Sequence, residues 1–185
     1  MGTAYYYFVA SLPRLAFAEK AAYSFEQFCG DCQRLLSGRD FKTIQDFLQS
    51  EEPSIKAFTN SFLQTINQFD IDFRNEAAWF QAEAMNKDPL GYLRGPRNSN
   101  PKVIDALAEA SESLDPLEAE KILDRARWQY FDELLQGHYF DFECLVVYGL
   151  KLKILERYKM VDSEAGGEIF AEYKKEILAA IGQNN

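Results

Sequence analysis

Cys29 and Cys32 are the residues whose types and spacing come closest to those of a redox centre. Two thiols separated by two residues at the start of a helix can lower a thiolate pKa and close a reversible disulfide. A thioredoxin-like site also requires a strand that leads into the motif within a βαβ unit, whereas this pair lies inside a helical pattern with Cys32 on the apolar side. We therefore interpret both as small buried thiols. A thiol protein that uses them is kept as an alternative.

Four residues carry side chains that zinc accepts, namely Cys29, Cys32, His138 and Cys144. The first two have the tight spacing of a zinc ligand pair, but the last two are loosely spaced. Unrelated core residues are the simpler interpretation, so we expect no metal ligand. A zinc protein that uses this set remains a second alternative.

The chain has one histidine, His138, and this limits the reactions that it could catalyse. Hydrolytic triads and di-iron carboxylate bundles use histidine in most of their versions. Nucleotide binding lacks support as well, because no glycine-rich loop follows a strand-like segment. We therefore expect no catalytic residue and no cofactor, and predict that the protein is not an enzyme by itself.

The 185-residue chain is acidic, with 20 Lys+Arg against 29 Asp+Glu and a formal net charge of -9 at pH 7. Such a charge repels nucleic acid and anionic lipid. No apolar run approaches the roughly 20 residues that span a bilayer, and the N-terminus lacks the pattern of a signal peptide. We expect a cytoplasmic protein that neither binds nucleic acid nor inserts directly into a membrane.

The elements that would position these residues are helices. From Ser24 onward, apolar residues recur at three- and four-residue intervals between cap and stop signals. The pattern predicts an all-α fold, a compact bundle of about six to seven helices with one long helix. We expect a single helical domain over residues 1–185, which the loop at 86–100 could divide into two lobes. The predicted helices, each given from its cap or first residue, are 24–37, 40–52, 53–85, 100–110, 115–136, 141–155 and 163–182.

Two segments leave alternatives open. Residues 4–12 have the aromatic and β-branched content of a strand, but no comparable second strand follows, so we favour a short buried helix or an extended segment packed on the bundle. The longest apolar pattern begins at Pro53 and continues without Gly or Pro to Pro89. It predicts either one unusually long helix or two helices with a break near 70–72.

The segment 125–141 is the densest in large polar-tipped residues. Trp128, Phe131 and Leu135 form a second apolar stripe beside the one that faces the core. A helix with two apolar stripes either lies deep in the bundle or offers one stripe to a partner, and burial is the commoner case. The helix that follows from Asp141 is apolar around nearly its whole circumference, so we expect it at the centre of the fold.

Two parts of the chain resemble a known family. They are Tyr5-Tyr6-Tyr7-Phe8-Val9-Ala10-Ser11-Leu12-Pro13 and the run from Arg127-Trp128 through Gly137-His138-Tyr139-Phe140-Asp141 to Leu150–Arg157. They resemble a family of uncharacterised bacterial proteins whose genes lie among those of V-type (archaeal-like) rotary ATPases. That family occurs where the operon would otherwise encode the socket of the central stalk, the helical component that couples the rotor shaft to the proteolipid ring and that also has a eukaryotic counterpart.

The resemblance implies a non-catalytic structural or coupling component of a V-type rotary ATPase. Its partners would be the shaft or the proteolipid ring, which would make the protein peripheral to the inner membrane. The typical socket protein is longer and built from three similar bundles, whereas this chain shows no internal repeat. A stand-alone helical adaptor or regulatory module is the alternative. The candidate interaction residues are aromatic residues of these segments and arginines that stand out in an acidic chain, namely Tyr5, Tyr6, Arg94, Arg97, Arg127, Trp128, Phe131, His138 and Tyr139.

Overall fold

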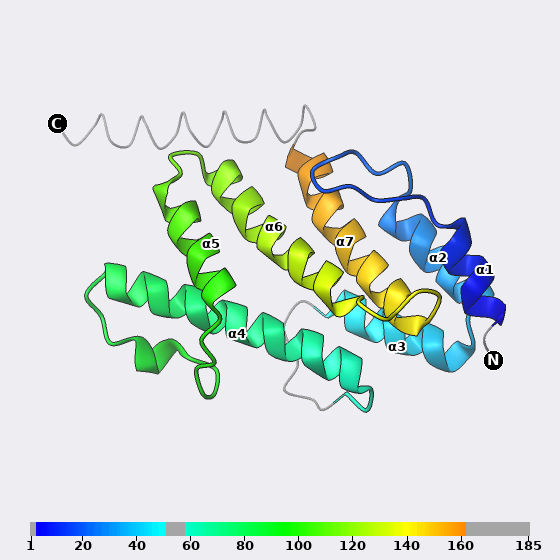
Figure 1. The fold of residues 1–185 in the computed structure, drawn as a ribbon, viewed down its shortest axis with the longest axis horizontal. Coiled ribbons are helices and arrows are strands. Elements are labelled where there is room, and N and C mark those ends of the chain that lie inside the picture. The colour runs from blue at the N-terminus through cyan, green and yellow to red at the C-terminus, as the bar shows by residue number, and fades with distance from the viewer. Residues whose placement is uncertain (1–2, 51–57, 162–185) are drawn as a thin grey trace, which may run out of the picture.

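The computed structural model describes residues 3–50 and 58–161. Over these residues the chain forms seven α-helices and one short 3₁₀ helix without any strand, which confirms the predicted all-α fold (Figure 1). No helix in the described ranges is long and apolar enough to cross a bilayer. The predicted helix 163–182 lies outside the described residues. In chain order the elements are α1 (Thr3–Ser11), α2 (Phe25–Leu35), α3 (Gly38–Gln49), α4 (Ser61–Ala84), η1 (Pro89–Tyr92), α5 (Pro101–Glu112), α6 (Pro116–Leu134) and α7 (Phe142–Val161).

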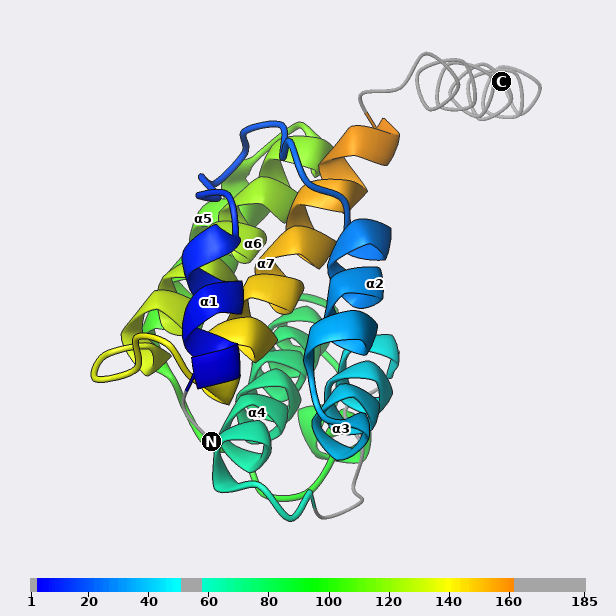
Figure 2. The same ribbon diagram turned by 90° about the vertical axis from the view of Figure 1, so that its right-hand side faces the viewer.

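Helix α7 lies at the centre of the main core, as its apolar circumference predicted. Leu145, Val146, Val147 and Leu152 on this helix are completely buried. Helices α1, α2, α3 and α6 all contact it, and Figure 2 shows it between α1 and α2. Because neighbours cover several of its sides, α7 can be apolar all round without exposing a hydrophobic face.

Gly149 allows α7 to approach α2 and α3 closely. A β-carbon at this position would overlap Leu48 Cδ1 and lie 2.9 Å from Phe28 Cε1. Leu48 and Phe28 are themselves buried at 1% and 0% exposure, so neither side chain has space to move aside. This contact among the three helices therefore depends on a residue without a side chain.

A second, smaller core lies where α4 meets the α5–α6 hairpin. Its buried residues are Phe69, Phe73, Val103 and Leu107. Tyr130 on α6 stacks on Phe69 with ring centroids 3.6 Å apart, and it packs against both cores. In Figure 1, α4 runs beneath the hairpin and continues toward the main core. The long helix thus contributes side chains to both clusters.

Several helices begin where local capping residues predicted. The Ser24 hydroxyl accepts the Gln27 N–H, while the Gln27 side chain accepts the Ser24 N–H, which completes a capping box at the start of α2. Asn100 and Asp115 cap α5 and α6, and a proline follows each of them as the first helical residue. These starts need only residues close in sequence, so they could be predicted from the sequence.

The predicted cap of the second helix was wrong. Helix α3 begins at Gly38 because the Ser37 hydroxyl, rather than the Asp40 carboxylate, accepts the first free N–H groups, with Asp40 N–H as the donor. The Asp40 carboxylate instead accepts hydrogen bonds from the Ser37 hydroxyl and from the Tyr5 hydroxyl of α1. A long-range partner therefore displaced Asp40 from the capping role.

The long helix begins later than predicted. Helix α4 starts at Ser61, because the Asn60 side chain accepts the N–H groups of Phe62 and Leu63. Pro53, the predicted first residue, lies outside the described residues. The alternative with a break near 70–72 is wrong, since α4 continues unbroken through these positions.

The N-terminal segment is a helix rather than an extended segment. Phe8 of α1 is buried against the main core and stacks on Phe28 with centroids 6.0 Å apart. A helix satisfies its own backbone groups, which a lone strand could not do. Of the two alternatives for this segment, the short helix is therefore confirmed.

We predict that Gly149→Ala destabilises the protein by about 1–3 kcal/mol, because overpacking a filled core outweighs the gain in helix propensity. Urea denaturation would measure the change in the free energy of unfolding. Gly30→Ala on α2 is the matched control, since nothing lies within 4 Å of the carbon it adds. That control should stabilise the protein by up to about 1 kcal/mol. Equal effects of the two substitutions would contradict the close packing at Gly149.

Candidate protein-interaction surface

Four aromatic side chains gather on the outside of the molecule, from α1 and from the loop between α6 and α7. They are Tyr6, Tyr7, Tyr139 and Phe140, and they are exposed by 49%, 72%, 73% and 43%. The Tyr6 and Phe140 rings lie 4.5 Å apart, and Tyr6 and Tyr7 are 5.7 Å apart in an edge-on arrangement. We call these four residues the aromatic surface. Aromatic residues are enriched in protein interfaces, so a cluster of exposed ones is a candidate binding site.

Helix α1 is held by the side chains that flank its exposed pair. Phe8 is buried in the core, and the Tyr5 hydroxyl donates a hydrogen bond of 2.6 Å to Asp40. Because successive helical residues point about 100° apart, anchoring these two positions turns Tyr6 and Tyr7 outward. Burial, the hydrogen bond to Asp40 and its charge together raise the pKa of Tyr5 well above its usual value. That hydroxyl therefore stays protonated and remains a hydrogen-bond donor.

The loop between α6 and α7 is held just as closely. Helix α6 ends at Leu134 with Leu135 as its C-cap, and two residues later Gly137 has a φ of +92°, in the left-handed region that glycine favours. The His138 N–H donates to the Leu135 carbonyl at 2.9 Å, and the His138 ring packs edge-on against Phe62 of α4 with centroids 5.3 Å apart. The two residues that follow, Tyr139 and Phe140, are left on the outside.

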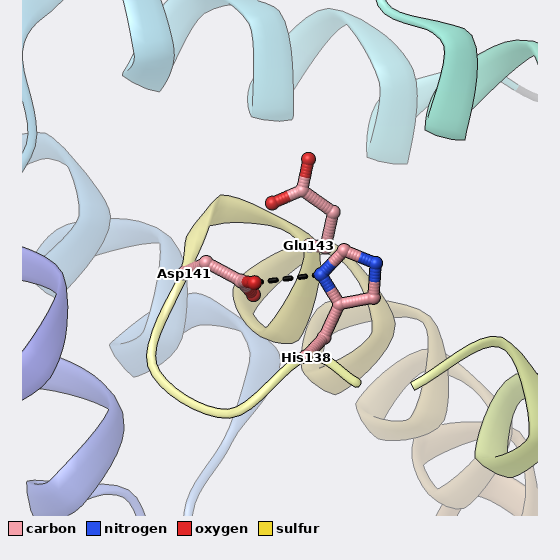
Figure 3. A group of neighbouring side chains, drawn as sticks. All are labelled: His138, Asp141 and Glu143. Carbon is pink, nitrogen blue, oxygen red and sulfur yellow. Dashed lines mark hydrogen bonds and ion pairs between the residues drawn. The ribbon is translucent and has the colours of Figure 1, made fainter. Parts of the chain in front are cut away.

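Asp141 fixes the other end of this loop. One carboxylate oxygen lies 2.6 Å from His138 Nδ1, and the other accepts the Cys144 N–H at 3.1 Å, which confirms Asp141 as the predicted cap of α7. Burial alone would raise the pKa of Asp141, but the hydrogen bonds from His138 and Cys144, with the charge of His138, hold it below its usual value. Figure 3 shows the Asp141 carboxylate next to the His138 ring, with the Glu143 side chain nearby.

His138, Asp141 and Glu143 also form the group of potential metal ligands in the described part of the chain. Their candidate ligand atoms lie within 4.8 Å of one another. Asp141, however, is already used by the helix cap and by His138. These bonds assign His138 and Asp141 to the support of the loop.

A groove adjoins the aromatic surface. Its volume is about 330 Å³, and its mostly apolar walls come from the end of α1 with the chain after it, from the loop at 135–139 and from α7. Tyr139 and His138 form part of its rim. A partner that covers the exposed rings would therefore also find a shallow apolar recess beside them.

Two predicted interaction residues lie in the core instead. Trp128 and Phe131 are exposed by only 7% and 6% and belong to the main core. Lys151 Nζ lies 4.6 Å from the centre of the Trp128 ring, and Phe17 packs edge-on against it. Of the two alternatives for this apolar stripe, burial is therefore what the structure supports, because α7 covers it.

The predicted arginines lie away from the aromatic surface and hold parts of the fold together. Arg97 makes a bidentate ion pair with buried Glu76, at 2.9 and 2.8 Å, and stacks 4.0 Å above the Trp79 ring. The backbone N–H and carbonyl of Arg94 bond the side chain of Asn75. Both attach the loop 86–100 to α4. Arg127 bonds the buried carboxylate of Asp124.

Tyr7 and Phe140 were missing from the predicted interaction residues. The sequence contained a signal for Tyr7, because a helix over residues 3–11 with Phe8 inward necessarily turns Tyr7 away from the core. Phe140 had no comparable signal, since its exposure depends on how the loop before α7 is held. The contact between Tyr6 and Phe140 joins residues too far apart in sequence for any local pattern to pair them.

The environment of the cysteines disfavours their thiolate forms, and none of them belongs to the group of potential metal ligands in the described residues. Burial raises the pKa of Cys29, and it raises the pKa of Cys32 to about 12. Cys29 interacts electrostatically with Glu156 and Lys153, which lie roughly 14–18 Å along α7 from Cys144. All three cysteines are free. The four residues considered for zinc are therefore not brought together.

We predict that no thiol of the folded protein reacts faster than an ordinary cysteine at pH 7, because burial stabilises the neutral thiol. Cys32 and Cys144, with a pKa of about 12 and about 11, should react with a disulfide reagent only after denaturant is added. A colorimetric thiol titration with and without denaturant measures this. One native thiol that reacts rapidly at pH 6 would reinstate the thiol alternative.

We predict that Asp141 contributes stability that depends on pH. Because its folded pKa is lowered from the ordinary 3.8, its contribution is complete above about pH 5 and is lost as the pH falls through the folded pKa. Asp141→Asn keeps a capping oxygen but removes the charge. Thermal unfolding between pH 2.5 and 7 should therefore show a difference from the parent protein that shrinks in acid. Asp141→Ala, which also removes the cap, should cost about 1 kcal/mol more at every pH. A pH-independent effect of Asp141→Asn would contradict this assignment.

One family model matches the chain, over residues 102–181, and its description is "Protein of unknown function (DUF2764)". The matched range includes α6, α7 and all of α5 except its first residue, and hence Tyr139 and Phe140 of the aromatic surface, whereas Tyr6 and Tyr7 precede it. No curated protein and no solved structure matches the chain. Within the described residues, the likeness to this family therefore concerns the helices from α5 to α7. Its description assigns no role to the aromatic surface.

Proposed function

We propose that this protein is a non-catalytic structural or coupling component of a V-type rotary ATPase and that it binds the central stalk or rotor through the aromatic surface. The observation that supports the proposal best is the contact of Tyr6 with Phe140. These rings belong to the two segments that resemble the ATPase-associated family, residues 5–13 and 127–157. Two distant segments that share one resemblance and meet at one exposed surface suggest a common role there.

The physical character of the surface also favours protein binding. Tyrosine offers a large contact area with few rotatable bonds and often carries much of the energy of an interface. Here the rings stand on anchored backbone, because Phe8, Asp40 and Asp141 hold the segments on either side. Pre-organised side chains lose little conformational entropy on binding. A cluster of exposed aromatic side chains on an anchored backbone is therefore well suited to binding another protein.

Charge indicates what kind of partner surface would fit. Asp40 bonds Tyr5, the neighbour of Tyr6 in the chain, Asp141 directly follows Phe140, and the whole chain is acidic. A complementary partner would place an apolar patch on the rings and lysine or arginine at the rim. In the proposed role the protein would be cytoplasmic and peripheral to the inner membrane through the ATPase.

A stand-alone helical adaptor is the second candidate. It would use the same exposed rings, so the aromatic surface supports it equally, and the identity of the partner separates the two proposals. The raised pKa values of Cys29 and Cys32 argue against a thiol protein.

We predict that the parent protein, captured from its native cell under conditions that keep the rotary ATPase intact, recovers rotor or central-stalk subunits. The double variant Tyr7→Ala with Tyr139→Ala should weaken this association at least tenfold, because each ring is exposed and hot-spot tyrosines contribute more than about 1 kcal/mol. Its stability should change little, since neither side chain is buried.

Tyr92→Ala is the matched control, because Tyr92 is an exposed tyrosine of η1 outside the aromatic surface. It should capture the same subunits as the parent protein. Recovery of no ATPase subunit by the parent protein would overturn the ATPase proposal, and recovery of unrelated proteins through the same two tyrosines would favour the adaptor. Undiminished capture by the double variant would overturn the role of the aromatic surface.

A further inference from the structure

A separate cleft lies among α3, α4, α6 and α7 and has a volume of about 350 Å³. Its walls combine aromatic and aliphatic side chains with four cationic ones, which are Arg74, Arg127, Lys153 and Arg157. Such a concentration of positive charge is unexpected in a chain with a formal net charge of -9. The cleft shares no residue with the aromatic surface, so it requires its own explanation.

The apolar walls of the cleft are fixed by the main core and the second core. Phe47, Ile66, Phe69, Phe131 and Ile154 line it, and each is buried on its other sides. Phe58 packs edge-on against Phe47 with centroids 5.1 Å apart. Because these rings also support the fold, the cleft cannot close by rearranging its walls without loss of packing.

Two of the cationic groups are held in place by a buried carboxylate. Asp124 is 1% exposed and accepts hydrogen bonds from Arg127 at 2.9 Å, from Arg157 at 2.5 Å and from the Tyr158 hydroxyl at 2.9 Å. The Arg127 guanidinium also stacks 4.0 Å above the Phe73 ring. A guanidinium has five N–H donors in a rigid fork. Asp124 takes one from each arginine, so further donors remain on both of them.

The two arginines that Asp124 holds outnumber the carboxylate that they share. Arg127 and Arg157 bring two positive charges to the single negative charge of Asp124, so these three side chains together are cationic. Arg74 at the same cleft pairs with Asp70 at 3.1 Å, and Lys153 donates to the Leu48 carbonyl at the end of α3. A low-dielectric wall strengthens the attraction of such charges for an anion.

We propose that this cleft binds a small organic oxyanion, with Arg127 and Arg157 holding its acid group and the aromatic walls holding its apolar body. Guanidinium groups match the geometry of carboxylates and phosphates, which favours an oxyanion over other anions. A volume of about 350 Å³ lies near the lower end of the range for small-molecule pockets, so it favours a compact ligand over a peptide segment. The inference is independent of the proposed partner at the aromatic surface.

Titration of the isotope-labelled full chain with 3-phenylpropionate, followed by amide chemical shifts, tests the proposal. Saturable shifts should centre on α7 and α6 around Arg127, Phe131 and Ile154, with a dissociation constant near the millimolar range expected for a ligand of about ten heavy atoms. The neutral 3-phenylpropanamide and the small anion acetate should each bind at least tenfold more weakly. A titration with phenyl phosphate shows whether the cleft prefers a phosphate or a carboxylate. Whichever of phenyl phosphate and 3-phenylpropionate binds more tightly identifies the preferred acid group.

Arg157→Gln should weaken binding of the tighter acid at least tenfold, while Arg127 and Tyr158 still bond Asp124. Arg34→Gln is the matched control, because Arg34 pairs with Asp31 outside the cleft. It should leave the affinity unchanged. If Arg157→Gln lowers the melting temperature so far that the folded state is lost, Arg157→Lys keeps the charge and should still weaken binding several-fold by losing the fork.

Three results would overturn the proposal. The first is equal affinity for the acid and its amide, and the second is saturable shifts that centre outside the cleft. The third is the absence of saturable shifts at ligand concentrations up to about fifty times the expected millimolar dissociation constant. An N-acetylated, C-amidated Asp-Phe dipeptide provides the last arm of the test. If it binds more tightly than either free acid, the cleft accommodates a partner's acidic segment and the assignment to a small molecule is wrong.

Discussion

The arrangement of the main core depends on the burial of α7. A helix with apolar residues on nearly all sides is stable only if neighbours cover it, and α1, α2, α3 and α6 do so. The approach of α2 and α3 to α7 is possible because Gly149 has no side chain where Leu48 and Phe28 meet it. Once α7 is fixed in this way, its N-terminus determines where the loop before it lies, and its C-terminal half carries Lys153 and Arg157 into the cleft. Both candidate sites thus depend on one buried helix.

Buried polar groups set the alignment of the elements around this core. Asp124 of α6 is bonded by Arg157 and Tyr158 of α7, and these bonds fix how the two helices lie along each other. Glu76 does the same for the loop that carries Arg97. In the described residues, no buried side-chain N or O atom lacks a partner. Because a buried carboxylate without its cations would be strongly unfavourable, such groups select one arrangement among those that apolar packing alone would allow.

The sequence predicted those features that depend on near neighbours. The Ser24 capping box, the caps Asn100 and Asp115 and the central place of α7 follow from local patterns. The starts of α3 and α4 did not, because Ser37 caps α3 while Asp40 bonds Tyr5, and Asn60 caps α4 where the sequence pattern pointed to Pro53. At α3 the physical cause is that a polar side chain with two possible partners is assigned by the tertiary structure.

The candidate sites were harder to predict than the helices for a related reason. Trp128, with its large ring, fits an interface anchor by residue type, and only the covering by α7 and Phe17 makes it a core residue. Arg97, which stood out in an acidic chain, is explained by Glu76, a residue that a sequence pattern would assign to solvent.

The reverse holds at the aromatic surface and in the cleft, where residues of ordinary local pattern become distinctive through their neighbours. Phe140 and Tyr6 become candidate interaction residues because their rings are in contact. Arg127 and Arg157 become candidate ligand-binding residues because they share one carboxylate. The loop with Phe140 and the position of Arg157 lie at opposite ends of α7, about 20 Å apart by helix rise. Because α7 lies between them, the proposed protein-binding surface at one end of this helix and the proposed small-molecule cleft near the other do not obstruct each other.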